Sequence, residues 1–305
     1  MKALEAQLAN VLAREMPMKK IVEILRSHDR HWVGDGFPVR SLFSYRGDAA
    51  AISPFLLFDY AGPHHFTPST TQRGVGQHPH RGFETVTIVY DGEVSHKDSS
   101  GGGGTIGPGD VQWMTAASGI IHEEFHSTGF ARTGGPFRMV QLWVNLPAKD
   151  KMAVPGYQAI TSVNIPIVGI ADGNAKARII AGELNGVKGP ARTFSPVNLW
   201  DLRLDADAEL TLELPAGHTA MISVLAGHIT VNGKTGVAEA EVVRFERDGS
   251  QVAMHADGAA MLLVMTGEPI NEPLVGYGPF VMNSEAEIRR AAADFNSGHF
   301  AKIVH

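Results

Sequence analysis

The fold class is decided by Thr85-Val-Thr-Ile-Val-Tyr-Asp-Gly-Glu-Val94. The residues from Thr85 to Tyr90 are all β-branched or aromatic, and such side chains fit the pleated surface of a β-strand. The dipeptide Asp91-Gly92 that follows is a typical turn between two antiparallel strands. The stretch therefore predicts a β-hairpin in the first half of the chain.

The same order of strand, glycine turn and strand recurs in the second half, at Ser223-Val-Leu-Ala-Gly-His-Ile229. Other short strands are separated by turn signals; the turn Gly107-Pro-Gly-Asp110, for example, precedes the strand-like Val111-Gln-Trp-Met114. Many short strands at regular spacing favour an antiparallel barrel or sandwich. Two similar halves predict an all-β protein built by internal duplication of one barrel.

The end of the chain departs from this pattern. Ser284 and Glu287 have the spacing of a helix capping box, and apolar residues at helical intervals follow over 288–295. We therefore expect one C-terminal helix that packs on a barrel.

Composition excludes several classes of protein. Hydrophobic residues make up 44% of the 305 residues and charged residues 19%, as in a compact protein with a core. The net charge of -6 provides no basic surface, so direct nucleic-acid binding is not expected. No run approaches the roughly 20 apolar residues that span a bilayer, and the first 20 residues contain no signal-peptide core. Cysteine is absent, which fits a reducing compartment, and we expect a cytoplasmic protein.

The chain divides into three parts. Residues 1–20 have leucine and alanine spaced as in an amphipathic helix, and Met16 and Met18 follow, so we expect an N-terminal extension. The polar segment 147–154 interrupts the strand pattern. We therefore expect a metal-binding N-terminal domain over 21–147 and a C-terminal domain over 148–305 that includes the helix.

Two pairs of residues carry the chemistry: His78 with His80, and His122 with Glu124. Residues i and i+2 of a strand project from the same face, so each pair presents two ligands in one direction. Three imidazoles and one carboxylate suit Fe(2+), Mn, Ni, Cu or Zn, and suit oxygen-preferring Mg or Ca poorly. A single His-x-His pair is often only an exposed polar pair; two pairs with this spacing predict a metal site.

The second half lacks such pairs. His218, His228 and His255 form neither a His-x-His nor a His-x-Glu pair, so we expect no metal there. The glycine run 101–104 is interpreted as a flexible hairpin loop, because neither a Lys-Ser/Thr pair nor a helix start follows it, as a phosphate-binding loop would require.

Several longer motifs together resemble the pirin family of bicupins, nearly throughout the chain, from about residue 37 to 295. The motifs are His78-Pro-His-Arg-Gly-Phe-Glu-Thr-Val86, Pro108-Gly-Asp-Val-Gln-Trp-Met-Thr-Ala116, Gly119-Ile-Ile-His122, Gln141-Leu-Trp-Val-Asn-Leu146 and Gly278-Pro-Phe-Val-Met-Asn283. The resemblance implies two stacked cupin (jelly-roll) β-barrels, with iron in the N-terminal one and an empty C-terminal one. It places the ligands on His78, His80, His122 and Glu124.

Other acidic residues remain alternatives. In the general cupin pattern a glutamate four residues after the second histidine is a ligand, and Glu84 occupies that position. Because the pirin pattern uses Glu124 instead, we expect Glu84 to lie behind the ligands and support them. Glu123 points to the opposite face if its strand is regular. Asp59 matches a family aspartate near the pocket, or is a hydrogen-bonded turn residue. Three further candidates for the pocket lining are interpreted as core residues rather than substrate contacts: Phe83, Met114 and Gln141.

The resemblance implies three readings of function. In the first, the protein is a quercetin 2,3-dioxygenase: a flavonol binds the metal through its 3-hydroxyl, Glu124 is the base, and dioxygen opens the heterocyclic ring with release of carbon monoxide. In the second, the metal's oxidation state alters a surface that a protein partner recognises, as befits a family with a nuclear mammalian transcription cofactor. In the third, the metal site is structural, closed to solvent and without turnover.

Overall fold

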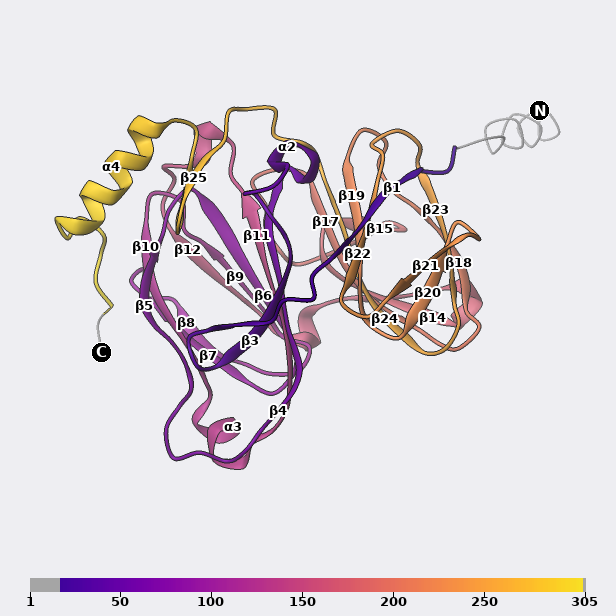
Figure 1. The fold of residues 1–305 in the computed structure, drawn as a ribbon, viewed down its shortest axis with the longest axis horizontal. Coiled ribbons are helices and arrows are strands. Elements are labelled where there is room, and N and C mark those ends of the chain that lie inside the picture. Colours follow the sequence, from indigo (N-terminus) through magenta and orange to yellow (C-terminus); the bar gives the residue numbers. More distant parts are fainter. Residues whose placement is uncertain (1–16, 304–305) are drawn as a thin grey trace.

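The computed structural model describes residues 17–303, and most of its regular structure is β-strand (Figure 1). The strands form two barrels side by side, which confirms the prediction of an all-β bicupin with a C-terminal helix. Most of the predicted N-terminal extension, residues 1–20, lies outside the described residues. No helix among the described residues combines the length and the apolar character needed to span a bilayer.

The first half contains a seven-stranded and a four-stranded sheet. The larger sheet has the order β12 (Gly156–Ile160), β9 (Val111–Thr115), β6 (Phe83–Asp91), β11 (Gly135–Asn145), β4 (Phe55–Phe66), β3 (Phe37–Ser44) and β2 (His31–Val33). The smaller sheet has the order β5 (Gly74–His80), β10 (Ile120–His126), β7 (Val94–Asp98) and β8 (Gly103–Ile106). Residues 85–94 do not form the predicted hairpin, because β6 and β7 do not pair with each other; the turn at Asp91-Gly92 joins β6 in one sheet to β7 in the other.

The second half repeats this arrangement. Its larger sheet has the order β1 (Ile21–Arg26), β22 (Glu241–Phe245), β19 (Thr219–Ala226), β24 (Ala260–Gly267), β17 (Val197–Leu204), β14 (Ala175–Ala181) and β13 (Ile167–Ile170). Its smaller sheet has the order β18 (Glu209–Glu213), β23 (Gln251–Ala256), β20 (His228–Val231) and β21 (Thr235–Ala238). The strand–glycine turn–strand stretch of residues 223–229 joins β19 to β20, as its counterpart joins β6 to β7.

The remaining elements are short, apart from one helix. They are the hairpin of β15 (Glu183–Leu184) and β16 (Val187–Lys188), the hairpin of β25 (Val275–Tyr277) and β26 (Phe280–Met282), the helices α2 (Ala49–Ile52), α3 (Thr128–Thr133) and α4 (Glu285–Asn296), and the short 3₁₀ helices η1 (Ala148–Asp150), η2 (Ser162–Asn164) and η3 (Ala171–Gly173).

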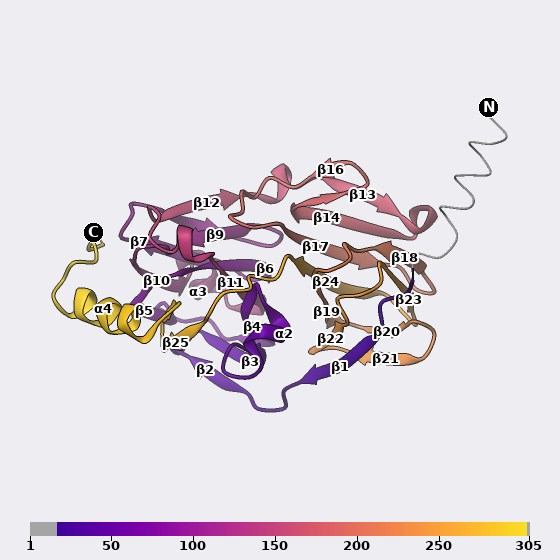
Figure 2. The same cartoon turned by 90° about the horizontal axis from the view of Figure 1, so that it is seen from above.

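Each half lends one strand to the other's larger sheet. β1 precedes the first barrel in sequence but pairs with β22 of the second, and β12 follows the first barrel's strands yet pairs with β9 (Figure 2). The division of the chain at residues 20/21 and 147/148 stays a prediction. β1 lies before the 147/148 division and β12 after it, and each pairs with a strand on the other side of that division.

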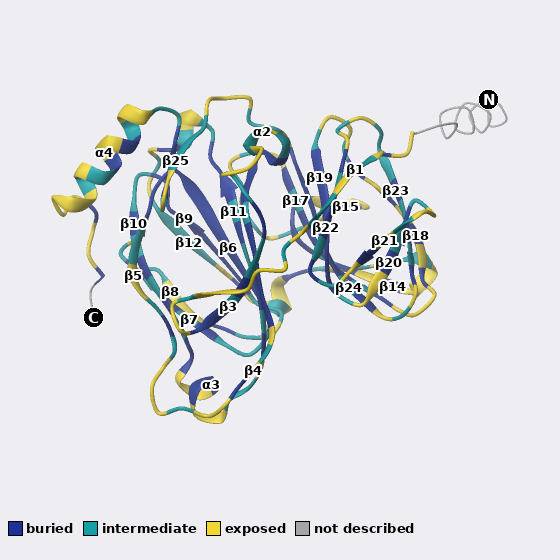
Figure 3. Cartoon of the chain, viewed as in Figure 1, coloured by how far each residue is buried: buried dark blue, intermediate teal, exposed yellow. Residues whose placement is uncertain are grey.

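The two large sheets pack against each other through apolar side chains. Val86 and Ile88 of β6 belong to the same buried cluster as Met221 of β19 and Leu263 of β24. Each fully buried side chain of this kind stabilises the fold by about 1.5–3 kcal/mol. Alternation along β6 turns Thr87, between Val86 and Ile88, toward the interior of the first barrel. Figure 3 shows that the strands at this interface are buried over most of their length.

Helix α4 begins as the capping box predicts. The Ser284 hydroxyl accepts a hydrogen bond from the backbone N–H of Glu287 at 3.3 Å, and the Glu287 carboxylate accepts one from the backbone N–H of Asn283 at 3.1 Å. Its buried residues Ile288 and Ala291 pack on the C-terminal hairpin, on the flank of the first barrel away from the second (Figures 1 and 2). The C-terminal segment thus returns to the half that carries the predicted metal ligands.

Candidate metal centre

The two predicted ligand segments lie side by side. β5 and β10 are antiparallel neighbours, and His78 is directly opposite His122. Buried and partly exposed residues alternate strictly along β10, so His122 and Glu124 point inward and Glu123 points outward. The parity that the sequence predicted for these three residues is confirmed.

Three imidazoles meet at this point. One ligand nitrogen from each of His78, His80 and His122 lies within 4.8 Å of the other two. The same limit gathers a second group, His96, His122 and Glu124. His122 belongs to both groups, and among residues 17–303 no group contains all four predicted ligands.

Two of the imidazoles have unpartnered nitrogens in the protein interior. Nδ1 of His80 and Nε2 of His122 are buried and accept or donate no hydrogen bond. Burial, and then the neighbouring His78 ring, holds the pKa of both histidines well below the usual value. A buried nitrogen without a partner costs about 1–3 kcal/mol, and a neutral imidazole is the form that binds metal. These residues therefore fit a divalent transition metal.

Glu124 is held by amides from the opposite sheet. Its Oε1 accepts a hydrogen bond from Gln112 Nε2 at 2.6 Å, and its Oε2 accepts one from Gln141 Nε2 at 3.2 Å. Thr87 lies at 3.5 Å from Oε1. Glu124 is almost fully buried, with 4% of the residue exposed, so the orientation of its carboxylate is set by these donors rather than by solvent.

The donors belong to a row of polar residues that crosses the larger sheet. Residues opposite one another in antiparallel strands share a face. The row consists, strand by strand, of Gln112, Thr87, Gln141, Asp59 and Ser41. Asp59 accepts a hydrogen bond from Ser41, and burial raises its pKa despite that bond. Asp59 thus lies in the row beside Gln141 and belongs to neither group of ligands.

Two further residues, His96 and Asp98 of β7, complete the centre and were not among the predicted ligands. His96 Nε2 lies 2.9 Å from Asp98 Oδ2, and both side chains are fully buried. Nδ1 of His96 lies 3.3 Å from Nδ1 of His122. The signal was present in the sequence, because His96-Lys-Asp98 has the same i, i+2 spacing on a strand as the two pairs that were used.

Glu84 does not lie behind the ligands, contrary to the expectation from the cupin pattern. It accepts a hydrogen bond from Thr115 Oγ1 at 2.7 Å and shares its side of β6 with Val86 and Ile88, which face the second barrel. The turn at Gly82, where φ is +91°, separates β5 from β6, so residue parity does not carry across it. Burial raises the pKa of Glu84 to about 7, although the Thr115 hydrogen bond opposes this.

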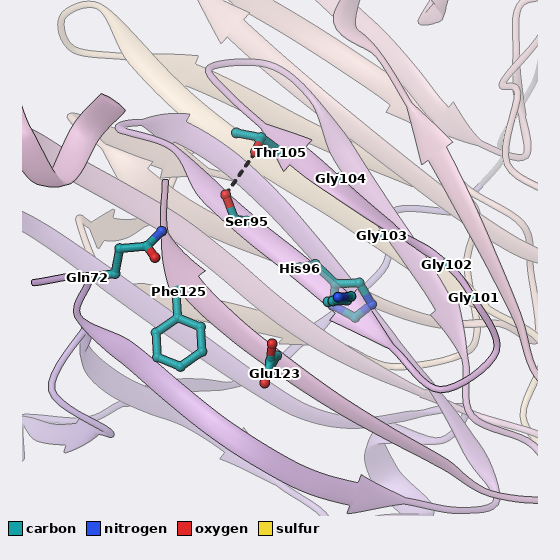
Figure 4. Close-up of a pocket in the computed structure, with 11 residues that line it drawn as sticks. Gln72, Ser95, His96, Gly101, Gly102, Gly103, Gly104, Thr105, Glu123 and Phe125 are labelled. Carbon is teal, nitrogen blue, oxygen red and sulfur yellow. Dashed lines mark hydrogen bonds between the residues drawn. The ribbon is translucent and has the colours of Figure 1, made fainter. Parts of the chain in front are cut away.

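Glu123 lines a groove of about 490 Å³ on the outer face of the smaller sheet, with Phe125 beside it (Figure 4). The glycine run 101–104 borders the same groove. Its first residues form the turn predicted from the sequence, but Gly103 and Gly104 already belong to strand β8. Glu123 and Phe125 thus line the groove from the face of β10 opposite to His122 and Glu124, and His96 of β7 also borders the groove.

The three candidates for the pocket lining differ. Phe83 and Met114 are fully buried in apolar clusters, as their interpretation as core residues predicts. Gln141 is not a core residue, because its amide donates to Glu124. In the second half, His228 forms an exposed pair with Asp257, and both groups of candidate ligands lie in the first half.

The comparisons with known proteins cover both halves. Two family models match: Pirin over residues 36–144, and Pirin C-terminal cupin domain over residues 199–301. A Pseudomonas aeruginosa protein named "Putative quercetin 2,3-dioxygenase" is 56% identical over 285 residues, which are 93% of this chain and 99% of that protein.

Two solved structures have the same fold. A crystal structure of quercetin 2,3-dioxygenase from Acinetobacter baumannii superposes with a TM-score of 0.92 at 53% identity, covering 94% of this chain and 100% of that one. A bacterial pirin from Escherichia coli, solved in complex with nickel(II), shares the fold with a TM-score of 0.62 at 19% identity, covering 81% of this chain and 98% of that one. The chain therefore belongs to the pirin family.

Proposed function

We propose that the first barrel binds one divalent transition metal through His78, His80, His122 and Glu124, and that the loaded protein is a dioxygenase of the quercetin 2,3-dioxygenase type. The observation that carries the proposal is the pair of buried, unpartnered imidazole nitrogens, on His80 and His122, beside a buried carboxylate. The names of the 56% identical relative and of the 53% identical structure support the reaction type. Fe(2+) is the metal we propose, with Mn, Ni, Cu and Zn as alternatives that the same donors accept.

The metal, when bound, would lower the pKa of a coordinating hydroxyl group. The residues of the chain supply the rest. Glu124 accepts the proton of the flavonol 3-hydroxyl on a carboxylate oxygen, and Gln112 and Gln141 hold that carboxylate in place as it does so. Glu124 and Gln112 are buried from water, which strengthens the polar contact between them.

The overall reaction consumes one flavonol and one dioxygen. Both oxygen atoms enter the ring-opened ester, and one ring carbon leaves as carbon monoxide. The substrates are therefore a small aromatic molecule and dioxygen, and the proton taken by Glu124 returns to the product.

The test is metal analysis of the protein as purified, followed by reconstitution and assay against a panel of flavonols. We expect loss of the flavonol absorption band together with oxygen uptake in the metal-loaded protein only. A zinc-only protein that, after reconstitution with each of the other metals, still consumes neither quercetin nor dioxygen would overturn the proposal.

A further inference from the structure

A chain of three buried groups runs from β7 to the metal centre: Asp98, His96 and His122. The Nε2 of His96 lies 2.9 Å from Asp98 Oδ2, and the Nδ1 of His96 lies 3.3 Å from the Nδ1 of His122. The far nitrogen of His122, Nε2, is the buried atom that has no partner within the protein.

The direction of the protons along this chain follows from Asp98. Its other oxygen, Oδ1, accepts hydrogen bonds from Ser100 N at 2.7 Å, Ser100 Oγ at 2.6 Å and Gly102 N at 3.1 Å. An ionised carboxylate only accepts, so Oδ2 accepts the Nε2 proton of His96.

A neutral imidazole has one N–H, so Nδ1 of His96 is left as an acceptor. It then accepts the Nδ1 proton of His122, and the lone pair of His122 lies on Nε2. Only this arrangement leaves a lone pair, rather than an N–H, on the nitrogen that has no partner in the protein.

We propose that His96 and Asp98 are positioning residues, which fix the tautomer and ring plane of His122 so that its Nε2 lone pair is presented to the metal. The inference rests on the proposed metal centre and adds two residues to it. A metal-bound histidine usually donates its other N–H directly to a carboxylate or carbonyl oxygen; here a second imidazole carries the interaction to the carboxylate.

The neighbouring residues hold this chain rigidly. The His96 ring stacks on Tyr157, with ring centroids 5.0 Å apart and an angle of 14° between the planes. Gly102 is closely packed against Asp98 and Tyr157: a Cβ added at Gly102 would lie 2.6 Å from Asp98 Oδ2 and 2.6 Å from Tyr157 Cβ. Figure 4 shows His96 beside the glycine run that contains Gly102. These contacts leave His96 little freedom to adopt another orientation.

The variant Asp98→Asn tests the direction of the hydrogen bonds that run from His122 through His96 to Asp98. The three donors at Oδ1 keep the amide oxygen on their side, so the NH2 group replaces Oδ2 and faces His96. His96 must then place its proton on Nδ1, against the Nδ1 proton of His122. We expect the affinity for Ni²⁺, measured by competition with a chelator, to fall about 10- to 100-fold.

The control is Asp257→Asn, which changes the exposed His228–Asp257 pair of the second barrel and should leave Ni²⁺ affinity unchanged. A second measurement needs no variant. Nitrogen-15 NMR of the metal-free wild-type protein should place the proton of His122 on Nδ1 and that of His96 on Nε2.

The inference is overturned if NMR places the His122 proton on Nε2, or if folded Asp98→Asn binds Ni²⁺ within twofold of the wild type. Neither readout uses a flavonol or dioxygen, so a failure of the dioxygenase proposal leaves this result intact. If the wild type binds no metal, or if the variant does not fold, the NMR measurement alone decides the tautomers.

Discussion

Gln112 donates a 2.6 Å hydrogen bond from its side-chain amide to Oε1 of Glu124, joining the larger sheet of the first barrel to the smaller one. Gln141 makes the corresponding contact with Oε2 at 3.2 Å. Glu124 is therefore oriented by residues that are not its neighbours in sequence. The position of this carboxylate depends on the pairing of β9, β6 and β11, and a change in that row should act directly on the proposed base.

Gln112→Leu should lower kcat for a flavonol about tenfold or more. The substitution removes the shortest hydrogen bond to the carboxylate, and a hydrogen bond to a charged group contributes about 1.5–3 kcal/mol. Steady-state turnover at saturating substrate measures the effect. Gln158→Leu is the matched control, since the Gln158 side chain forms hydrogen bonds with the backbone of Arg192, away from Glu124. Equal kcat for Gln112→Leu and the wild type would remove Gln112 from the mechanism.

Glu124→Gln and Glu123→Gln should differ sharply, although the residues are adjacent. The first removes a buried carboxylate that faces the imidazoles, and loss of a general base costs about 10²–10⁴-fold in rate. The second changes a residue on the outer face of the same strand and should retain turnover within about twofold of the wild type. Oxygen-uptake assays of both variants decide this, and comparable loss in the two would contradict the assignment.

Stability should fall as pH rises through the range set by Glu84. Burial raises its pKa from 4.5 to about 7, so between these values the folded state binds more protons than the unfolded state. The stabilisation is fully present below pH 4.5 and is lost as pH rises to about 7, amounting to about 3 kcal/mol at 1.36 kcal/mol per pKa unit.

Glu84→Gln should remove this dependence, because the amide stays neutral and keeps the shape of the protonated acid. Urea unfolding at pH 5 and pH 8 is the measurement. The variant should exceed the wild type in stability at pH 8 and differ little from it at pH 5. A wild-type advantage at pH 8 would show that Glu84 is stabilised as a carboxylate.

Lys151→Met should destabilise the first barrel by about 2–4 kcal/mol. The buried ammonium donates to Gly82 O at 2.7 Å, to Asn145 Oδ1 at 2.7 Å and to Val281 O at 2.9 Å. Methionine leaves these acceptors buried without a donor, at about 1–3 kcal/mol for each one that water does not reach. Chemical denaturation measures the loss. Lys149→Met, at a position whose side chain is 78% exposed, should change the free energy of unfolding by less than about 0.5 kcal/mol.

The sequence predicted what depends on local chemistry. β-Branched runs and glycine turns indicated the strands, and the capping box at Ser284 and Glu287 indicated α4. The i, i+2 spacing brought His122 and Glu124 to one face of β10, because side-chain direction on a regular strand depends on parity alone.

The sequence did not predict what depends on distant pairing. Nothing in β1 or β12 indicates that its partner belongs to the other half of the chain. The predicted direction of the Glu84 side chain was wrong, because the prediction assumed that the alternation of side chains continues from His80 through the turn at Gly82. His96 and Asp98 were missed because a histidine followed by an aspartate is less distinctive than a pair of histidines, and only the pairing of β7 with β10 brings them to His122.

The most direct test of the proposed function loads the metal-free protein with increasing amounts of Fe²⁺ under anaerobic conditions. Oxygen is then admitted, and the consumption of dioxygen and of quercetin is measured together. We predict that the rate rises with added iron and saturates at one ion per chain, with one dioxygen consumed and one carbon monoxide released for each quercetin lost. A protein that carries one iron per chain and consumes neither quercetin nor dioxygen would contradict the central claim.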